Sequence, residues 1–157
     1  MCKLTISSDT VEINAPREWV WDILSDLERY PEWNPFTYKI EGSLEVKQLV
    51  DLHVRMPKRG DRVQTEIVET VDSPNQLAWG MTLSSKFILS ALRVQRLESL
   101  SEYRCTYITS DVFSGVLSPL VYLLFYRDVH NGFNQVAQAL KDRAESSWPG
   151  TPFKRYL

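Results

Sequence analysis

The chain of 157 residues has only two histidines and two cysteines, which limits the chemistry that it can perform. Cys2 and Cys105 are far apart, so the sequence contains neither a disulfide framework nor a paired-cysteine zinc site. It also lacks a glycine-rich phosphate loop, the His-x-x-x-His and His-Glu-x-x-His metal motifs, and a serine nucleophile elbow. These absences predict a protein that uses no metal and no cofactor.

Neither sign of charge dominates, since the net charge is −2 and the sequence pI is about 5.7. A nucleic-acid partner normally requires a basic patch, so we expect none. The N-terminus has no apolar segment of the kind found in signal peptides, and the longest apolar run, 117–126, has about half the length of a membrane span. We therefore expect a cytoplasmic protein without stable membrane insertion.

The composition is that of a globular protein, with 43% hydrophobic and 24% charged residues, and residues 1–157 are expected to form one domain. A strand is predicted over 3–13, with a bulge near Ser8, and a helix over 16–25 that begins at Pro16. Pro31 and Pro35 then allow at most one short helical turn. A long helix over 118–145 ends the pattern. Six strands with short antiparallel connections lie between, over 36–41, 49–56, 62–71, 76–83, 87–97 and 103–113.

An antiparallel sheet has one apolar face to cover, and a long helix can lie across it. If the sheet curls around that helix, the space between them holds either packed side chains or a cavity. The segment 30–36, YPEWNPF, places aromatic rings beside two prolines that fix a sharp bend. Its rings, Trp33 and Phe36 among them, are expected either to cover one end of the cavity or to plug the core there.

Several motifs resemble those of one superfamily. VEINAPREWVWDILSDLERYPEWNPF (11–36) has an Ala-Pro, a Val-Trp pair and an aromatic-Pro-x-Trp-Asn-Pro segment, while LAWG (77–80), VQRLESL (94–100) and SDVFSGVLSPLV (110–121) stand at matching places further on. The chain is thus similar to the SRPBCC superfamily, the START-like helix-grip proteins that include polyketide cyclase/dehydrase-type domains.

The resemblance implies an α+β helix-grip fold. Such a fold has a curved antiparallel sheet of about seven strands wrapped around a long C-terminal helix, two short helices after strand 1, and an internal cavity. It implies no shared catalytic set, because the superfamily includes lipid and hormone binders, aromatase/cyclases, ring hydroxylase domains and chaperone regulators.

Asp111, Tyr107 and His130 are candidates for proton transfer. Asp111 shares strand parity with Tyr107 and Phe113, so it is expected to point inward, where an unpaired carboxylate has a raised pKa. The alternative is a structural ion pair with Arg93 or Arg96. His130 lies at the edge of the inward stripe of the last helix, either as an acid/base group at the cavity rim or as a solvated side chain.

Rings with a polar tip suit a flat, partly oxygenated ligand such as an aromatic polyketide, a sterol or a quinone, and ordinary core packing is the alternative. The predicted ligand-binding residues are Trp33, Phe36, Tyr38, Trp79, Arg93, Phe113, Tyr126, Val129 and Phe133.

These features support two main hypotheses. The first is a module that binds a hydrophobic or aromatic small molecule in a cavity between sheet and C-terminal helix. The alternative is a cofactor-independent polyketide cyclase, aromatase or dehydratase-type enzyme, a lyase or isomerase. The run 117–126 is apolar all round, which indicates a helix covered on both sides, a cavity entrance or the contact of a homodimer.

Overall fold

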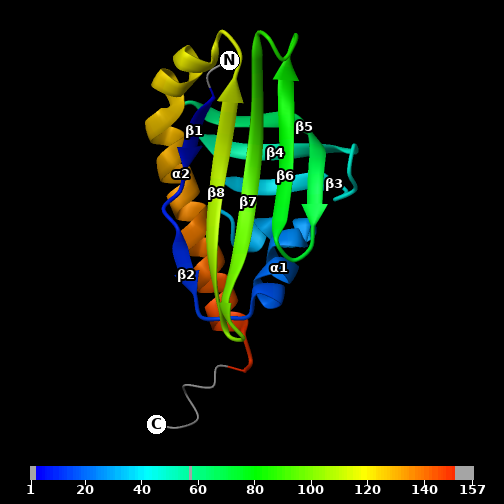
Figure 1. Ribbon diagram of the computed structural model, residues 1–157, viewed down its shortest axis with the longest axis vertical. Coiled ribbons are helices and arrows are strands. Elements are labelled where there is room, and N and C mark those ends of the chain that lie inside the picture. The colour runs from blue at the N-terminus through cyan, green and yellow to red at the C-terminus, as the bar shows by residue number, and fades with distance from the viewer. Residues whose placement is uncertain (1–2, 57, 151–157) are drawn as a thin grey trace.

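The computed structural model describes residues 3–56 and 58–150 of the protein. This part of the chain forms the predicted α+β helix-grip fold, in which an eight-stranded antiparallel sheet curves around one long helix (Figure 1). The elements are β1 (Leu4–Ser7), β2 (Val11–Ile13), α1 (Arg17–Ser25), the 3₁₀ helix η1 (Leu27–Glu32), β3 (Thr37–Gly42), β4 (Leu49–Met56), β5 (Gly60–Asp72), β6 (Gln76–Leu83), β7 (Leu89–Ser101), β8 (Arg104–Ser114) and α2 (Ser118–Ser147).

The first strand expected from the sequence is divided into β1 and β2, and both pair with β8. Ser7 lies opposite Ser110, while Val11 lies opposite Tyr107, so the N-terminal segment holds one extra residue between the two strands. This irregularity lies where the bulge was predicted. It allows Ile6 and Ile13, which differ in parity, to be buried on the same side of the sheet.

The strand order is β1-β8-β7-β6-β5-β4-β3. In Figure 1 the long strands β7 and β8 run nearly vertically, while β3 and β4 cross behind them, so the sheet is strongly bent. α2 lies along β1, β2 and β8, and α1 lies near the C-terminal end of α2. The bend therefore leaves a space between the sheet and α2.

Only part of this space is filled by side chains. The buried core includes Tyr30, Trp79, Tyr107 and Leu140, which pack between the sheet, α1 and the C-terminal part of α2. A pocket remains beside the N-terminal part of α2. The interior thus has a packed end and a hollow end.

The segment YPEWNPF lies at the junction between these two ends. The Tyr30 hydroxyl donates a hydrogen bond to the Leu24 carbonyl at 2.7 Å, and the side-chain oxygen of Asn34 accepts from the backbone N–H of Phe36 and Thr37. These bonds fix the bend that the prolines begin. The ring of Phe36 then packs edge-on against Phe133 of α2, with ring centroids 5.8 Å apart.

Gly132 allows α2 to approach Phe36 closely, because a Cβ at position 132 would lie 2.4 Å from the Phe36 ring. Alanine has a helix propensity about 1 kcal/mol better than glycine, but overpacking a core costs about 1–3 kcal/mol. We expect Gly132→Ala to lower the free energy of unfolding by about 1 kcal/mol in urea denaturation. Gln135→Ala, at an exposed position of the same helix, is the control. If Gly132→Ala is more stable than wild type, the Phe36 ring can move aside at no cost in free energy.

Candidate ligand-binding site

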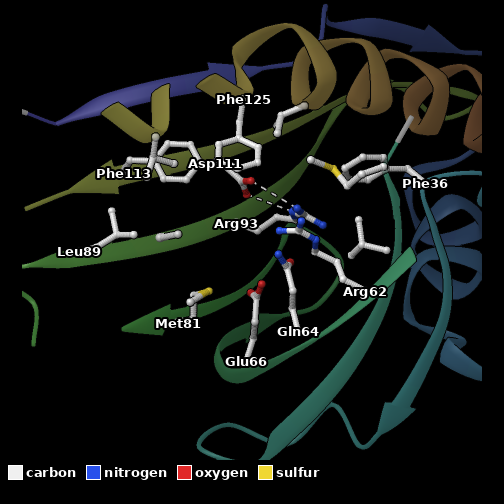
Figure 2. A pocket seen from close by; sticks show the side chains of 15 residues that line it. Phe36, Arg62, Gln64, Glu66, Met81, Leu89, Arg93, Asp111, Phe113 and Phe125 are labelled. Atoms are coloured by element: carbon white, nitrogen blue, oxygen red, sulfur yellow. Dashed lines mark hydrogen bonds and ion pairs between the residues drawn. The ribbon is translucent and has the colours of Figure 1, made fainter. Parts of the chain in front are cut away.

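The hollow end contains a pocket of about 200 Å³ between the curved sheet and the N-terminal part of α2 (Figure 2). One wall is apolar. Its side chains come from the segment before β3 and from β4, β6, β7, β8 and α2: Phe36, Val54, Met56, Met81, Leu89, Ala91, Phe113, Val121, Phe125 and Val129. This wall provides rings and aliphatic groups on which an apolar molecule can pack.

The facing wall is polar and belongs to β5, which places Arg62, Gln64 and Glu66 on the pocket (Figure 2). Opposed residues of an antiparallel pair share a face of the sheet. In the register of β4 and β5, these three residues lie opposite Val54, Leu52 and Val50, which are all buried on the concave side. The polar residues of β5 therefore point inward, whereas Val63 and Ile67 on the same strand are exposed.

Arg93 and Asp111 form a buried ion pair between β7 and β8. Arg93 Nε donates to Asp111 Oδ1 at 3.0 Å and Nη2 donates to Oδ2 at 3.3 Å, so the pair is bidentate. Nη1 donates to the Thr37 hydroxyl at 3.3 Å, and the guanidinium lies over the Phe133 ring at 4.7 Å. Burial alone would lower the pKa of Arg93. The negative charges of Asp111 and Glu66 together outweigh that effect, so the pKa of Arg93 lies above its usual value. Arg93 is therefore a fixed cation.

Glu66 differs from Asp111 because its carboxyl group has no hydrogen bond to any residue within 3–56 and 58–150. Its side chain is buried on the pocket wall. The pKa of Glu66 is raised to about 7, mainly by burial. The positive charge of Arg93 lowers this pKa and the negative charge of Asp111 raises it, but both effects are smaller than that of burial. Near neutral pH this carboxyl can therefore either donate or accept a proton.

The structure brings five of the residues predicted for the site to the pocket: Phe36, Arg93, Asp111, Phe113 and Val129. Phe133 packs directly behind Arg93. Tyr107 and Trp79 lie in the packed end instead, where the Tyr107 hydroxyl donates to Gln95 at 2.7 Å. Asp111 thus has the ion pair with Arg93 that was the structural alternative to catalysis, and it also borders the pocket.

The other four predicted residues lie away from this pocket. The Nδ1 of His130 donates to the Ser7 carbonyl at 2.7 Å, and its ring stacks on Tyr126 with centroids 5.5 Å apart, on the side of α2 that faces β1. Tyr38 lies under the guanidinium of Arg55. Trp33 borders a separate surface groove with Trp19, Ile23 and Arg143.

Glu66 and its neighbours on β5 were not predicted for the site. In the segment 62–71 both parities mix polar and apolar residues, with Val63 and Ile67 on one and Val68 on the other. The alternation therefore did not show which side faces the core. The buried face of β5 follows only from its register with β4, whose residues alternate clearly. That register depends on pairing between strands and could not be read from the segment 62–71 alone.

A curved sheet that grips a long helix around a pocket defines the START-like helix-grip class of proteins. The sequence matches the family model described as "Polyketide cyclase / dehydrase and lipid transport" over residues 4–145, and the chain belongs to this family. A search of curated proteins finds no match.

Solved structures have the same fold at low identity. The ZhuI aromatase/cyclase from Streptomyces sp. R1128 is 19% identical, with a TM-score of 0.73 over 92% of this chain and 94% of that one. Norcoclaurine synthase from Thalictrum flavum, in complex with dopamine and hydroxybenzaldehyde, is 14% identical, with a TM-score of 0.71 over 95% and 90%. A START superfamily protein from Mycobacterium smegmatis is 19% identical, with a TM-score of 0.68 over 90% and 97%.

Two further features are absent from residues 3–56 and 58–150. No helix in this part of the chain has the length and apolar character needed to cross a membrane. The same residues contain no group of three or more histidine, cysteine, aspartate or glutamate side chains placed to hold a metal ion.

Proposed function

We propose that the protein binds a small ring-containing molecule that has an apolar body and one oxygen-bearing edge. The observation that carries this proposal is the division of the pocket into an apolar wall, with Phe113 and Phe125, and a polar wall, with Gln64 and Glu66. The apolar wall fits the body of such a molecule. The polar wall fits its hydroxyl or carbonyl group, because neither Gln64 nor Glu66 has a side-chain partner within the described residues.

The pocket volume limits the size of the guest. At about 200 Å³ the pocket lies below the roughly 300–1,000 Å³ that is typical of sites for drug-sized ligands. This volume favours a molecule of one or two rings over a sterol or a long acyl chain. Norcoclaurine synthase, which shares the fold, binds dopamine and hydroxybenzaldehyde in its solved complex, and both are single-ring molecules with hydroxyl groups.

Filling the pocket should weaken the binding of such a molecule. Ala91 lines the pocket between Met81 and Phe113, so Ala91→Leu places a branched side chain in the cavity. We expect wild type to bind 2-naphthol in calorimetric titrations and Ala91→Leu to bind it at least about tenfold more weakly. Val94→Leu, which enlarges a side chain on the opposite face of β7, should bind like wild type.

Binding that is equal in the wild-type and Ala91→Leu proteins would show that 2-naphthol sits elsewhere. The absence of binding by any one- or two-ring phenol, enol or ketone would refute the proposal itself. Chemical-shift changes on titration should be confined to pocket residues such as Ala91 and Phe113.

A second candidate is a cofactor-independent cyclase or dehydratase-type activity in the same pocket. Glu66 favours it, because a carboxyl group with a pKa of about 7 can move a proton at neutral pH. Asp111 would then position Arg93 beside the reacting group. The family description and the aromatase/cyclase among the structures of this fold are consistent with such chemistry.

Glu66→Gln separates the two candidates. An enzyme should lose turnover of β-hydroxy or β-keto thioesters while the variant still folds and binds 2-naphthol. If turnover of any substrate found is unchanged in Glu66→Gln, this group does not transfer the proton.

A further inference from the structure

The apolar run on α2 forms an exposed surface. Val121 and Phe125 turn toward the pocket, but the side chains of Leu120, Leu123 and Leu124 are 54%, 78% and 50% exposed. Three leucines exposed to this extent on neighbouring turns are unusual for a helix that packs on a sheet. Exposed apolar patches of this kind often mark an interaction surface.

This surface continues onto the loop between β6 and β7. The backbone N–H of Val116 donates to the Phe87 carbonyl at 3.0 Å, which holds that loop against the start of α2. Phe87 is 64% exposed. Both segments lie at the same end of the molecule in Figure 1. We refer to the six residues of this surface as the apolar face: Phe87, Val116, Leu117, Leu120, Leu123 and Leu124.

The apolar face adjoins residues of α2 that line the pocket. On an α-helix, Leu117, Leu120 and Leu124 lie immediately beside Val121 and Phe125, which line the pocket. The turn between β4 and β5 contacts this part of α2, since Arg59 Nη2 donates a hydrogen bond to the Leu124 carbonyl at 3.3 Å.

Cations surround this surface. Arg127 follows the leucines on α2, Arg62 stands at the pocket, and Lys58 lies on the turn beside α2. Lys86 precedes Phe87 and also lines a groove on the outer face of the sheet. None of the four forms an ion pair within residues 3–56 and 58–150. Of the nearby exposed carboxylates, Asp61 pairs with Arg55 and Asp128 with Arg59, while Glu66 is buried on the pocket wall. The surroundings are thus positive although the whole chain has a net charge of −2.

We propose that the apolar face docks on the surface of an anionic lipid bilayer. Leucine and phenylalanine side chains can enter the boundary between headgroups and acyl chains, while lysine and arginine contact the lipid phosphates. A second copy of the chain is a poorer occupant, because a two-fold interface would place the unpaired cations of one copy against those of the other. Docking places the α2 side of the pocket, with Val121 and Phe125, next to the bilayer. The proposal stands whatever molecule the pocket binds.

Vesicle co-sedimentation of the full chain tests this proposal. We expect the protein to sediment with vesicles of phosphatidylcholine and phosphatidylglycerol in equal amounts, more weakly as salt is added, and only slightly with phosphatidylcholine alone. Leu120→Ser/Leu123→Ser should bind at least about tenfold more weakly, because it removes apolar contacts. Lys86→Glu/Arg127→Glu should bind more than about 30-fold more weakly, because the loss of each cation near an anionic surface costs about a factor of five and each new carboxylate is also repelled.

Matched controls keep the result specific. Leu49→Ser/Leu100→Ser changes two leucines of similar exposure elsewhere, and Lys47→Glu/Arg96→Glu makes the same charge change away from the face, so both should bind vesicles like wild type. Circular dichroism shows whether each variant is folded. The proposal is overturned if folded wild type does not sediment with anionic vesicles at low salt. It is also overturned if analytical ultracentrifugation shows a dimer that Leu120→Ser/Leu123→Ser dissociates.

Discussion

Arg93→Met and Asp111→Leu are each expected to lower the free energy of unfolding by about 3–5 kcal/mol at pH 7. Each substitution leaves the other member of the ion pair charged and buried, since Arg93 is 8% and Asp111 is 7% exposed. The Arg93 guanidinium also packs over the rings of Phe36 and Phe133, which it would have to leave to reach bulk water. The loss should appear as a lower urea midpoint in far-ultraviolet circular dichroism, with an unchanged slope.

The double variant Arg93→Met/Asp111→Leu distinguishes an ion pair from two independent contributions. With both charges replaced by apolar groups, no buried ion lacks a partner, so we expect it to be clearly more stable than either single variant. Arg96→Met, at an exposed position of the same strand, should change stability by less than about 0.5 kcal/mol. If the double variant instead loses the sum of the two single losses in free energy of unfolding, the two charges do not stabilise each other.

Much of the fold could be predicted because it depends on local patterns. Pro16 precedes the first turn of α1, the alternation of β4 identifies its buried side, and Val129 and Phe133 lie at helical spacing on α2. The irregularity between β1 and β2 was also visible, as the change of parity between Ile6 and Ile13. These features are set within a few residues of the chain.

The site was predicted less completely. The parity of a strand residue shows which face of the sheet its side chain is on, but it does not show whether that side chain reaches the pocket or the packed core. Tyr107 and Asp111 point to the same side of β8, yet only Asp111 reaches the pocket, since Tyr107 lies in the packed end, where its hydroxyl donates to Gln95. The position of His130 on the helix was correctly inferred as an edge. Its partner could not be inferred, because β1 approaches that edge from a distant part of the sequence.

Glu66→Gln is expected to stabilise the protein by about 3 kcal/mol at pH 8 and by much less at pH 5, since a tenfold change in proton affinity corresponds to about 1.4 kcal/mol. The pKa of Glu66 rises from its usual 4.5 to about 7 on folding, mainly because burial disfavours the charged form. Below about pH 4.5 the group is protonated in both states and folding carries no penalty. Between 4.5 and 7 the folded state retains a proton that the unfolded state releases, so wild-type stability falls as the pH rises. Above about pH 7 the penalty is complete.

Urea denaturation at the two pH values measures this difference, and other titrating groups cancel between wild type and variant. Glu69→Gln, at an exposed position of the same strand, should have the same small effect at pH 5 and at pH 8. A Glu66→Gln effect that does not change with pH would show that the carboxyl is solvated in the folded state.

An ionised carboxylate that weakens the fold and has no hydrogen-bond partner within the described residues supports the proposed role of Glu66 in binding or chemistry, since function commonly retains groups that stability disfavours. A bound hydroxyl that donates to Glu66 would replace the missing hydrogen bond. At pH 8 we therefore expect 2-naphthol to raise the thermal midpoint of wild type more than that of Glu66→Gln, with naphthalene as the control that lacks the hydroxyl. Equal shifts in the two proteins would place the polar edge of the guest away from β5.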